Sequence, residues 1–123
     1  MPFDHFDFIA PVYARAGDYG GLPTLTRLLD LPTTGRLLDV GGGTGRVARS
    51  LRDQAEQVVL ADVSLGMLRV AVSVPGLQPA ASASERLPYP DGSFSRVLIV
   101  DALHHVENHA QTAAEMWRVL QPG

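Results

Sequence analysis

Three aspartates and a group of glycines are the residues whose types and spacing could do chemistry. Each aspartate closes a short apolar run, at Asp39, Asp62 and Asp101. Four glycines follow the first run within five positions, at Gly41, Gly42, Gly43 and Gly45. Glycine has no Cβ, so such a backbone can turn sharply and approach a ligand closely. The stretch therefore predicts a ligand-binding loop with carboxylates beside it.

The spacing of these residues narrows the class of ligand. A dinucleotide fingerprint needs its third glycine at position 46, where this chain has Arg46. Asp62 follows the loop by roughly 20 residues, where such folds place an acid that binds the ribose hydroxyls. A cluster of carboxylates repels phosphate but suits a ligand that carries an ammonium and a sulfonium group. S-adenosylmethionine meets this description.

Strands and helices alternate along the sequence and would position these residues. Apolar runs predict strands at 36–40, 57–62, 77–81 and 96–101. Apolar residues at helical spacing predict helices at about 22–30, after the glycines, at 64–72 with Ser64 as cap, and after Asn108. This order is typical of a doubly wound, Rossmann-like α/β fold, a mostly parallel sheet with helices on both faces. The three aspartates are then expected to face one crevice at the carboxyl ends of the strands.

Two of these elements carry more detailed expectations. The strand at 96–101 is apolar throughout its middle, which predicts burial on both faces of the sheet. The last helix is expected to end at Pro122. Its predicted buried stripe consists of Ala110, Ala113 or Ala114, Trp117 and Leu120.

Composition and charge disfavour several classes of protein. The chain has 123 residues, 46% of them hydrophobic, which indicates one globular domain. A net charge of -3 without a basic run disfavours a nucleic-acid partner. The sequence has no cysteine, secretory signal or apolar run of membrane-spanning length, which fits a cytoplasmic protein. His105, Glu107 and His109 do not form a His-Glu-x-x-His arrangement, so no metal site is predicted.

Five blocks together resemble class I S-adenosylmethionine-dependent methyltransferases, most of all the branch of ubiquinone and menaquinone biosynthesis. The resemblance runs from about Phe6 to Gly123, in the family's order and spacing. The blocks are Leu37–Arg46, Ala61–Leu68, Glu85–Phe94, Leu103–Val106 and Arg118–Gly123. Five blocks in register are far more specific than one glycine loop.

The resemblance implies roles for individual residues. The backbone of the glycine loop, Gly42 included, would lie against the methionyl part and ribose, and Asp39 would hold the amino group. Asp62 would bind the ribose hydroxyls, while Val63 and Met67 would pack near the adenine. The family often has an Asp on the adenine amine where this chain has Ala83, and Ser84 could partly replace that contact. Asp101 is either a further pocket acid or a helix cap.

The reaction implied is methyl transfer to a small-molecule acceptor. It is an in-line displacement at a carbon that the sulfonium already activates, so positioning and water exclusion do most of the work. A base is needed only if the acceptor must lose a proton. His104 and His105, just after the fourth strand, are the candidates, and the alternative is that they shape the acceptor pocket.

Two other functions stay open on the sequence. One is an S-adenosylmethionine-binding fragment or interaction protein without activity, and the other is an NAD(P)-binding oxidoreductase. Residues 1–123 are expected to form a single domain, with a helical lead-in at 1–34 and four strand-helix units at 35–123. Family members continue with a further parallel strand and an antiparallel hairpin. The chain is therefore expected to be part of a longer protein, or to pair its uncovered strand edge in a homodimer.

Overall fold

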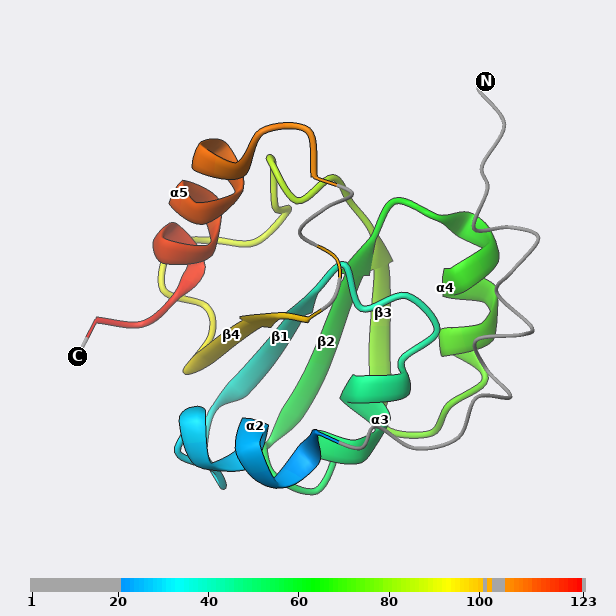
Figure 1. Cartoon of the computed structure of the whole chain (residues 1–123), viewed down its shortest axis with the longest axis vertical. Helices are drawn as coiled ribbons and strands as arrows, with labels where there is room; N and C mark the ends of the chain where they lie inside the picture. Colours follow the sequence, from blue (N-terminus) through cyan, green and yellow to red (C-terminus); the bar gives the residue numbers. More distant parts are fainter. Residues whose placement is uncertain (1–20, 101, 103–105, 123) are drawn as a thin grey trace.

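The structure is a computed structural model that describes residues 21–100, 102 and 106–122. All four strands and four helices predicted within this part of the chain are present (Figure 1). The strand predicted at 96–101 ends at Ile99, and the helical lead-in at 1–20 lies outside the described residues. The elements are α2 (Leu22–Leu28), β1 (Arg36–Val40), α3 (Arg46–Leu51), β2 (Gln57–Asp62), α4 (Leu65–Val72), β3 (Leu77–Ala81), β4 (Arg96–Ile99) and α5 (His109–Val119).

The four strands form one sheet in the order β3-β2-β1-β4, and every pair is parallel. In this register Leu38 of β1 lies opposite Val59 of β2 on one side and Val97 of β4 on the other. The chain therefore leaves β1 toward β2 and β3, and later returns to the opposite side of β1. This topology confirms the predicted doubly wound α/β fold. It also places the change of direction, where such folds bind ligands, between β1 and β4.

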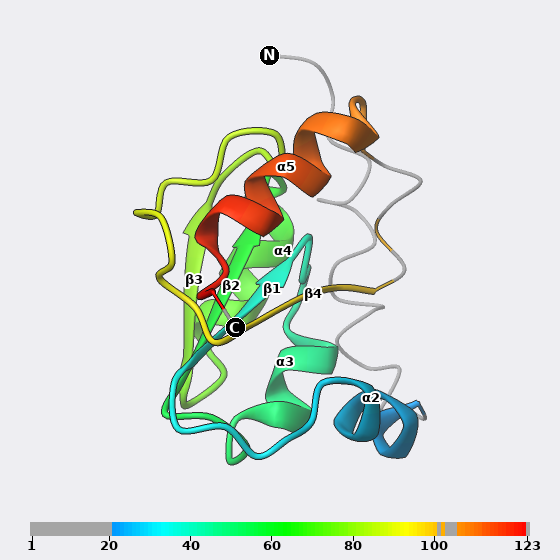
Figure 2. The same ribbon diagram turned by 90° about the vertical axis from the view of Figure 1, so that its left-hand side faces the viewer.

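Apolar clusters pack on both faces of the sheet. One joins Ala48 and Leu51 of α3 and Leu68 of α4 to the strands, with leucines of α2 packed against it. The other joins Phe94 of the connection between β3 and β4 and Val119 of α5 to the opposite face. Figure 2 shows α2 and α3 on one side of the sheet and the connection between β3 and β4 on the other. Helices and connections thus bury both faces, as a parallel sheet requires.

The predicted caps of two helices are confirmed. The Ser64 side chain accepts a hydrogen bond from the Met67 N–H at the start of α4. The Asn108 side chain accepts one from the Gln111 N–H at the start of α5. Each cap satisfies a backbone donor that has no partner inside its helix. Both helices therefore begin at the residues that the sequence predicts.

The predicted buried face of α5 is wrong. Trp117 is 80% exposed, and Ala110, Ala113 and Ala114 are exposed as well. The inner face carries Thr112 and Val119, the two fully buried residues of the helix. The apolar spacing misleads here because α5 is held to the rest of the protein largely by hydrogen bonds, which call for polar residues on its inner face.

The expected burial of the last strand is also wrong. Only Leu98 of β4 is buried, while Arg96, Val97 and Ile99 are partly exposed. Within the described residues β4 pairs with β1 alone, so its other edge has no neighbouring strand. An edge strand is covered less completely than a central one.

Candidate functional site

The glycine loop connects β1 to α3, and its glycines differ in what surrounds them. Gly43 has a φ of +61°, and the nearest side-chain atom to a Cβ placed there would be the Met67 sulfur at 3.7 Å. Gly45 has a φ of +87°, but a Cβ placed there would be 2.6 Å from a methyl carbon of Leu77. Gly43 therefore borders open space, whereas Gly45 lets the loop pack against the core.

Asp62 ties this loop to the start of α4. Its Oδ2 atom accepts a hydrogen bond from the Gly43 N–H at 2.9 Å, and its Oδ1 atom accepts one from the Ser64 N–H at 2.8 Å. Asp62 is thus held in a fixed orientation beside the loop.

Asp39 lies behind the loop in an apolar environment. It is 2% exposed, and its Oδ2 atom has no hydrogen-bond partner among the described residues. Burial, and secondarily the charge of Asp62, raises the pKa of Asp39 to about 7. A buried carboxylate oxygen without a partner is costly, and a nearby ammonium group would offset that cost.

A pocket opens at the carboxyl ends of the strands, and seven of the predicted cofactor-binding residues line it. They are Gly41, Gly42, Gly43, Asp62, Val63, Met67 and Ser84. The pocket extends from Ser82 and Ser84 after β3, past Asp62 and the glycine loop, to Val100 and Ala102 after β4. It therefore lies across the point where the direction of the chain changes, as expected for a ligand site in this fold.

Two of the predicted site residues, Asp39 and Gly45, do not line the pocket, and three others are not described. Asp39 is buried behind the loop and Gly45 faces the core. Asp101, His104 and His105 lie outside the described residues, so their roles stay predictions.

Sequence reasoning did not assign the remaining residues of the pocket wall to the site. Several of them directly follow a strand or flank the histidine pair, and their positions at the strand ends could have signalled a site role. Arg46 and Asp62 are the charged residues among the described lining. The residues that the sequence analysis missed are Val40, Thr44, Arg46, Val47, Ser82, Ile99, Val100, Ala102 and Val106.

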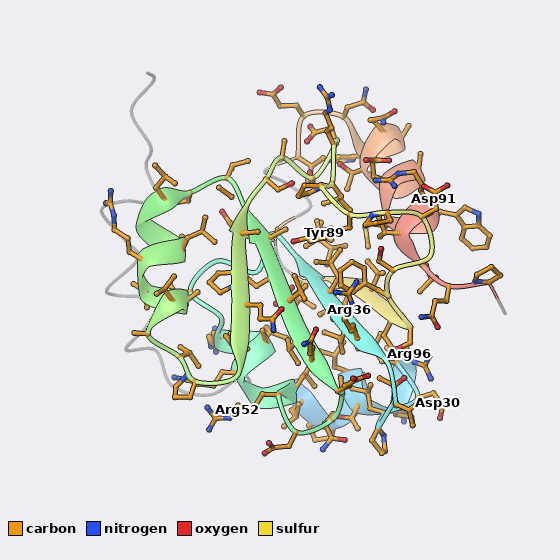
Figure 3. The ribbon with its side chains drawn as sticks, turned by 180° about the vertical axis from the view of Figure 1, so that it is seen from behind. Asp30, Arg36, Arg52, Tyr89, Asp91 and Arg96 are labelled. Carbon is orange, nitrogen blue, oxygen red and sulfur yellow. The ribbon has the colours of Figure 1, made fainter. Side chains whose placement is uncertain are left out.

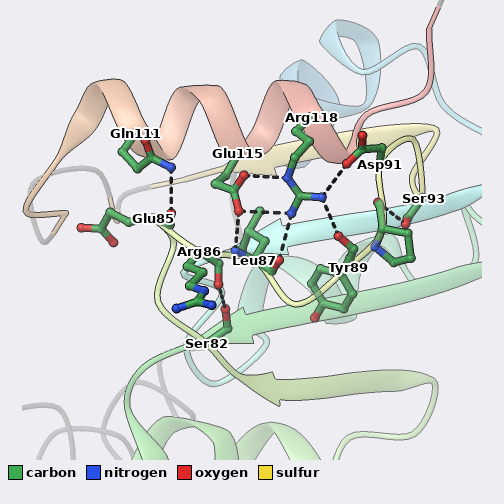
Figure 4. A network of polar contacts seen from close by, with 11 residues as sticks. Ser82, Glu85, Arg86, Leu87, Tyr89, Asp91, Ser93, Gln111, Glu115 and Arg118 are labelled. Carbon is green, nitrogen blue, oxygen red and sulfur yellow. Dashed lines mark hydrogen bonds and ion pairs between the residues drawn. The ribbon is translucent and has the colours of Figure 1, made fainter.

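Helix α5 holds the connection that forms the β3 side of the pocket. The Arg118 guanidinium donates to the carbonyl oxygens of Leu87 at 3.0 Å and Tyr89 at 2.8 Å (Figure 4). Glu115 accepts from the Leu87 N–H at 2.9 Å, and its hydrogen bond from Arg118 lowers the pKa of its carboxyl group. These contacts fix the path of residues 87–89 across the sheet.

Arg36 holds the same connection from the other end. Its guanidinium carbon lies 4.9 Å from the centre of the Phe94 ring, which also packs edge-on against the Tyr89 ring. Figure 3 shows Arg36 and Tyr89 on the same face of the sheet. Stacking of a cation on an aromatic ring stabilises this arrangement.

Two kinds of feature are not found among the described residues. No helix in that part of the chain is long and apolar enough to cross a membrane. No group of three or more His, Cys, Asp or Glu side chains there is arranged to hold a metal ion.

Comparison with known proteins identifies relatives of similar sequence. A family model for a methyltransferase domain matches residues 38–123. Demethylmenaquinone methyltransferase of Renibacterium salmoninarum is 36% identical over 126 residues, which cover 96% of this chain and 53% of the relative. A ubiquinone/menaquinone biosynthesis C-methyltransferase of Stenotrophomonas maltophilia is 38% identical over 98 residues, which cover 72% of this chain and 39% of that relative. The chain therefore spans about half the length of such relatives, or less.

Solved structures show the same fold. An S-adenosylmethionine-dependent methyltransferase of Mesorhizobium loti aligns with a TM-score of 0.75 at 28% identity, over 85% of this chain and 50% of the other. The [4+2]-cyclase SpnF aligns with a TM-score of 0.77 at 26% identity, over 96% of this chain and 54% of the cyclase. Together with the family match, the parallel sheet and the glycine loop, these similarities show that the chain belongs to the class I S-adenosylmethionine-dependent methyltransferase family.

Proposed function

We propose that this protein binds S-adenosylmethionine in the pocket at the strand ends and transfers its methyl group to a small-molecule acceptor. The observation that carries the proposal is the pocket itself. It has a glycine loop that borders open space at Gly43 and a carboxylate held in place at Asp62. Behind the loop lies a buried carboxylate oxygen of Asp39 without a described partner. A phosphate-bearing dinucleotide would place its charge beside these two acids, which disfavours an NAD(P)-dependent oxidoreductase.

The residues of the pocket fit the parts of this cofactor. Asp62 would accept hydrogen bonds from the ribose hydroxyls, and Asp39 would interact with the ammonium group, directly or through water. Val63 and Met67 offer apolar surface to the adenine. The backbone of Gly41, Gly42 and Gly43 would lie against the methionyl part, and Gly45 would support the loop from behind.

The protein's part in the reaction is to bind and orient. The bound cofactor supplies a methyl group that its sulfonium has already activated. Apolar pocket residues on the β4 side, Ile99, Val100 and Val106, would exclude water and hold the acceptor in line with that group. If the acceptor must lose a proton, His104 or His105 would accept it, and otherwise they would shape the acceptor pocket.

The relatives suggest the class of acceptor. Their names specify a demethylmenaquinone methyltransferase and a ubiquinone/menaquinone biosynthesis C-methyltransferase. We extend this to the present protein as C-methylation of a quinone precursor. The apolar residues on the β4 side of the pocket are compatible with such an acceptor.

A second candidate function is cofactor binding without methyl transfer. It is favoured by the fold of the [4+2]-cyclase SpnF, because a similar fold there carries a different activity.

Calorimetric titration with S-adenosylhomocysteine, S-adenosylmethionine and NADH tests the proposal. We expect both adenosyl ligands to bind and NADH not to bind, and Asp62→Ala to weaken binding about tenfold or more. Binding of NADH alone would contradict the proposal. Transfer of labelled methyl from the cofactor to a demethylated quinone then separates a methyltransferase from a protein that only binds the cofactor.

A further inference from the structure

Helix α4 carries apolar side chains around its whole circumference. Apart from Gly66 and Arg69, every residue of Leu65–Val72 has an apolar side chain. The inner face is buried, with Leu68 and Ala71 in the core. A helix at the surface of a protein normally has a polar outer face, so a helix that is apolar all round indicates that a further apolar surface covers it.

The outer face of α4 bears two aliphatic side chains with an arginine between them. Leu65 is 45% exposed, Val72 is 69% exposed, and Arg69 is exposed as well. The three residues follow one another at helical spacing and form one line along the helix, which we call the α4 stripe. Val63, just before the cap of α4, is 69% exposed and also lines the pocket. The α4 stripe therefore begins near the mouth of the pocket, and Figure 1 shows α4 at the margin of the described structure.

The helices on this face of the sheet contain arginines and no acidic residue. Helices α2, α3 and α4 pack against one apolar cluster, and Arg52, just after α3, donates to a carbonyl oxygen just after α4 at 3.3 Å. Their arginines are Arg27, Arg46, Arg49 and Arg69. Other than the acids of the candidate site, the acids that flank these helices are Asp30, Asp53 and Glu56, which lie in the connections that lead into β1 and β2, at the strand ends away from the pocket. The α4 stripe therefore lies in a region of positive charge.

The opposite face of the sheet has the reverse balance of charge. Its described elements are α5 and the connection between β3 and β4, which contain Arg86 and Arg118. The acids of these elements and of the turn before α5 are more numerous, namely Glu85, Asp91, Glu107 and Glu115. Trp117 is also exposed on this face, so both faces expose apolar side chains. An anionic partner is nevertheless attracted to the α4 face and repelled by the α5 face.

We propose that the α4 stripe is a docking surface for an anionic lipid bilayer, an interaction that goes beyond the proposed function and does not require it. Leu65 and Val72 enter the boundary between the headgroups and the acyl chains, as the apolar faces of interfacial helices do. Arg69 keeps its guanidinium at the lipid phosphates while its methylene carbons lie against apolar surface. Since Val63 joins the stripe to the pocket, the bilayer lies beside the pocket mouth, where an apolar acceptor passes from lipid to protein.

Cosedimentation of the full chain with lipid vesicles tests this proposal. We expect binding to vesicles of phosphatidylcholine with phosphatidylglycerol, weaker binding to phosphatidylcholine alone, and a decrease in binding as salt is added. Arg69→Gln should lower the affinity for the anionic vesicles about fivefold. The double variant Leu65→Ser/Val72→Ser should lower it about tenfold or more. Arg86→Gln and Trp117→Ala are the matched controls, because both residues are exposed on the opposite face, and they should leave binding unchanged.

Two measurements without vesicles separate docking from folding and from ligand binding. The double variant should unfold at nearly the wild-type temperature, because both of its substituted side chains are exposed. It should also bind S-adenosylhomocysteine as the wild type does, since no residue of the α4 stripe lines the pocket. If the wild type binds anionic vesicles but not S-adenosylhomocysteine, the proposed function fails and the docking proposal stands.

Several results would overturn the docking proposal and leave the proposed function untouched. One is no binding to anionic vesicles, or equal binding with and without phosphatidylglycerol. A loss of binding in Trp117→Ala, with the α4 variants unaffected, would assign docking to the α5 face. A large fall in the unfolding temperature of the double variant would show that another segment of this chain covers the α4 stripe. A dimer in solution that the double variant dissociates, without vesicle binding, would assign the stripe to a second copy.

Discussion

At the scale of single residues, Asp39 makes the stability of the fold depend on pH. Its pKa rises from 3.8 to about 7 on folding, chiefly through burial. Between these values the unfolded chain releases the Asp39 proton while the folded protein keeps it. The free energy of unfolding should therefore fall as pH rises from about 4 to about 7, by an amount on the order of 3 kcal/mol from this group alone.

Denaturant unfolding of the wild type and Asp39→Asn at pH 5 and pH 8 measures this effect. Asparagine has nearly the same shape but no charge at either pH, so the variant should lose most of the decrease that the wild type shows. The difference between the two proteins is the relevant quantity, because other groups that titrate in this range contribute to both. An equal decrease in both proteins would show that Asp39 does not carry a raised pKa.

At the scale of an element, the glycine loop allows stability and binding to be separated. Gly43 and Gly45 both have positive φ, so alanine strains either position by about 1 kcal/mol. A methyl group at Gly43 would enter the pocket, whereas one at Gly45 would collide with Leu77 in the core. We expect Gly43→Ala to weaken S-adenosylhomocysteine binding with a small loss of stability. Gly45→Ala should instead lower the stability by a further 1–3 kcal/mol, roughly.

Thermal unfolding and calorimetry of these two variants are the measurements. Binding corrected for the folded fraction should be reduced more in Gly43→Ala than in Gly45→Ala. If Gly45→Ala reduced binding more than Gly43→Ala, the ligand would contact the Gly45 side of the loop and not the Gly43 side.

Helix α5 gives a second prediction at this scale. Val119 is fully buried and Trp117 is 80% exposed, although the sequence pattern favoured Trp117 as a core residue. Val119→Ala should cost about 1–3 kcal/mol of unfolding free energy, while Trp117→Ala should cost less than about 0.5 kcal/mol. Trp117 is the single tryptophan of the chain, so its fluorescence reports its environment directly. We expect the emission of a solvent-exposed indole, which iodide quenches readily. A blue-shifted emission that iodide does not quench would contradict the exposed position of Trp117.

For the molecule as a whole, the sequence predicted the elements better than the contacts between them. The four strands, the caps Ser64 and Asn108 and the glycine loop follow from local patterns, and all are present. Sequence could not place the network of Thr112, Glu115 and Arg118, because apolar periodicity says nothing about helix faces that pack through hydrogen bonds. For the same reason it predicted Ser84 as a site residue but not the hydrogen bond between its hydroxyl group and that of Thr112 in α5.

The arrangement of the sheet predicts how stability is distributed over the molecule. Strands β1 and β2 pair on both sides and are buried, whereas β3 and β4 each pair on one side among the described residues. Hydrogen exchange should therefore be slowest in β1 and β2 and faster in β3, β4 and α5. S-adenosylhomocysteine should slow exchange further at the glycine loop, at Asp62–Met67 and at residues 82–86, since these segments line the pocket. Protection of β4 equal to that of β1 without ligand would contradict this distribution and would indicate that another chain segment or a second copy covers its outer edge.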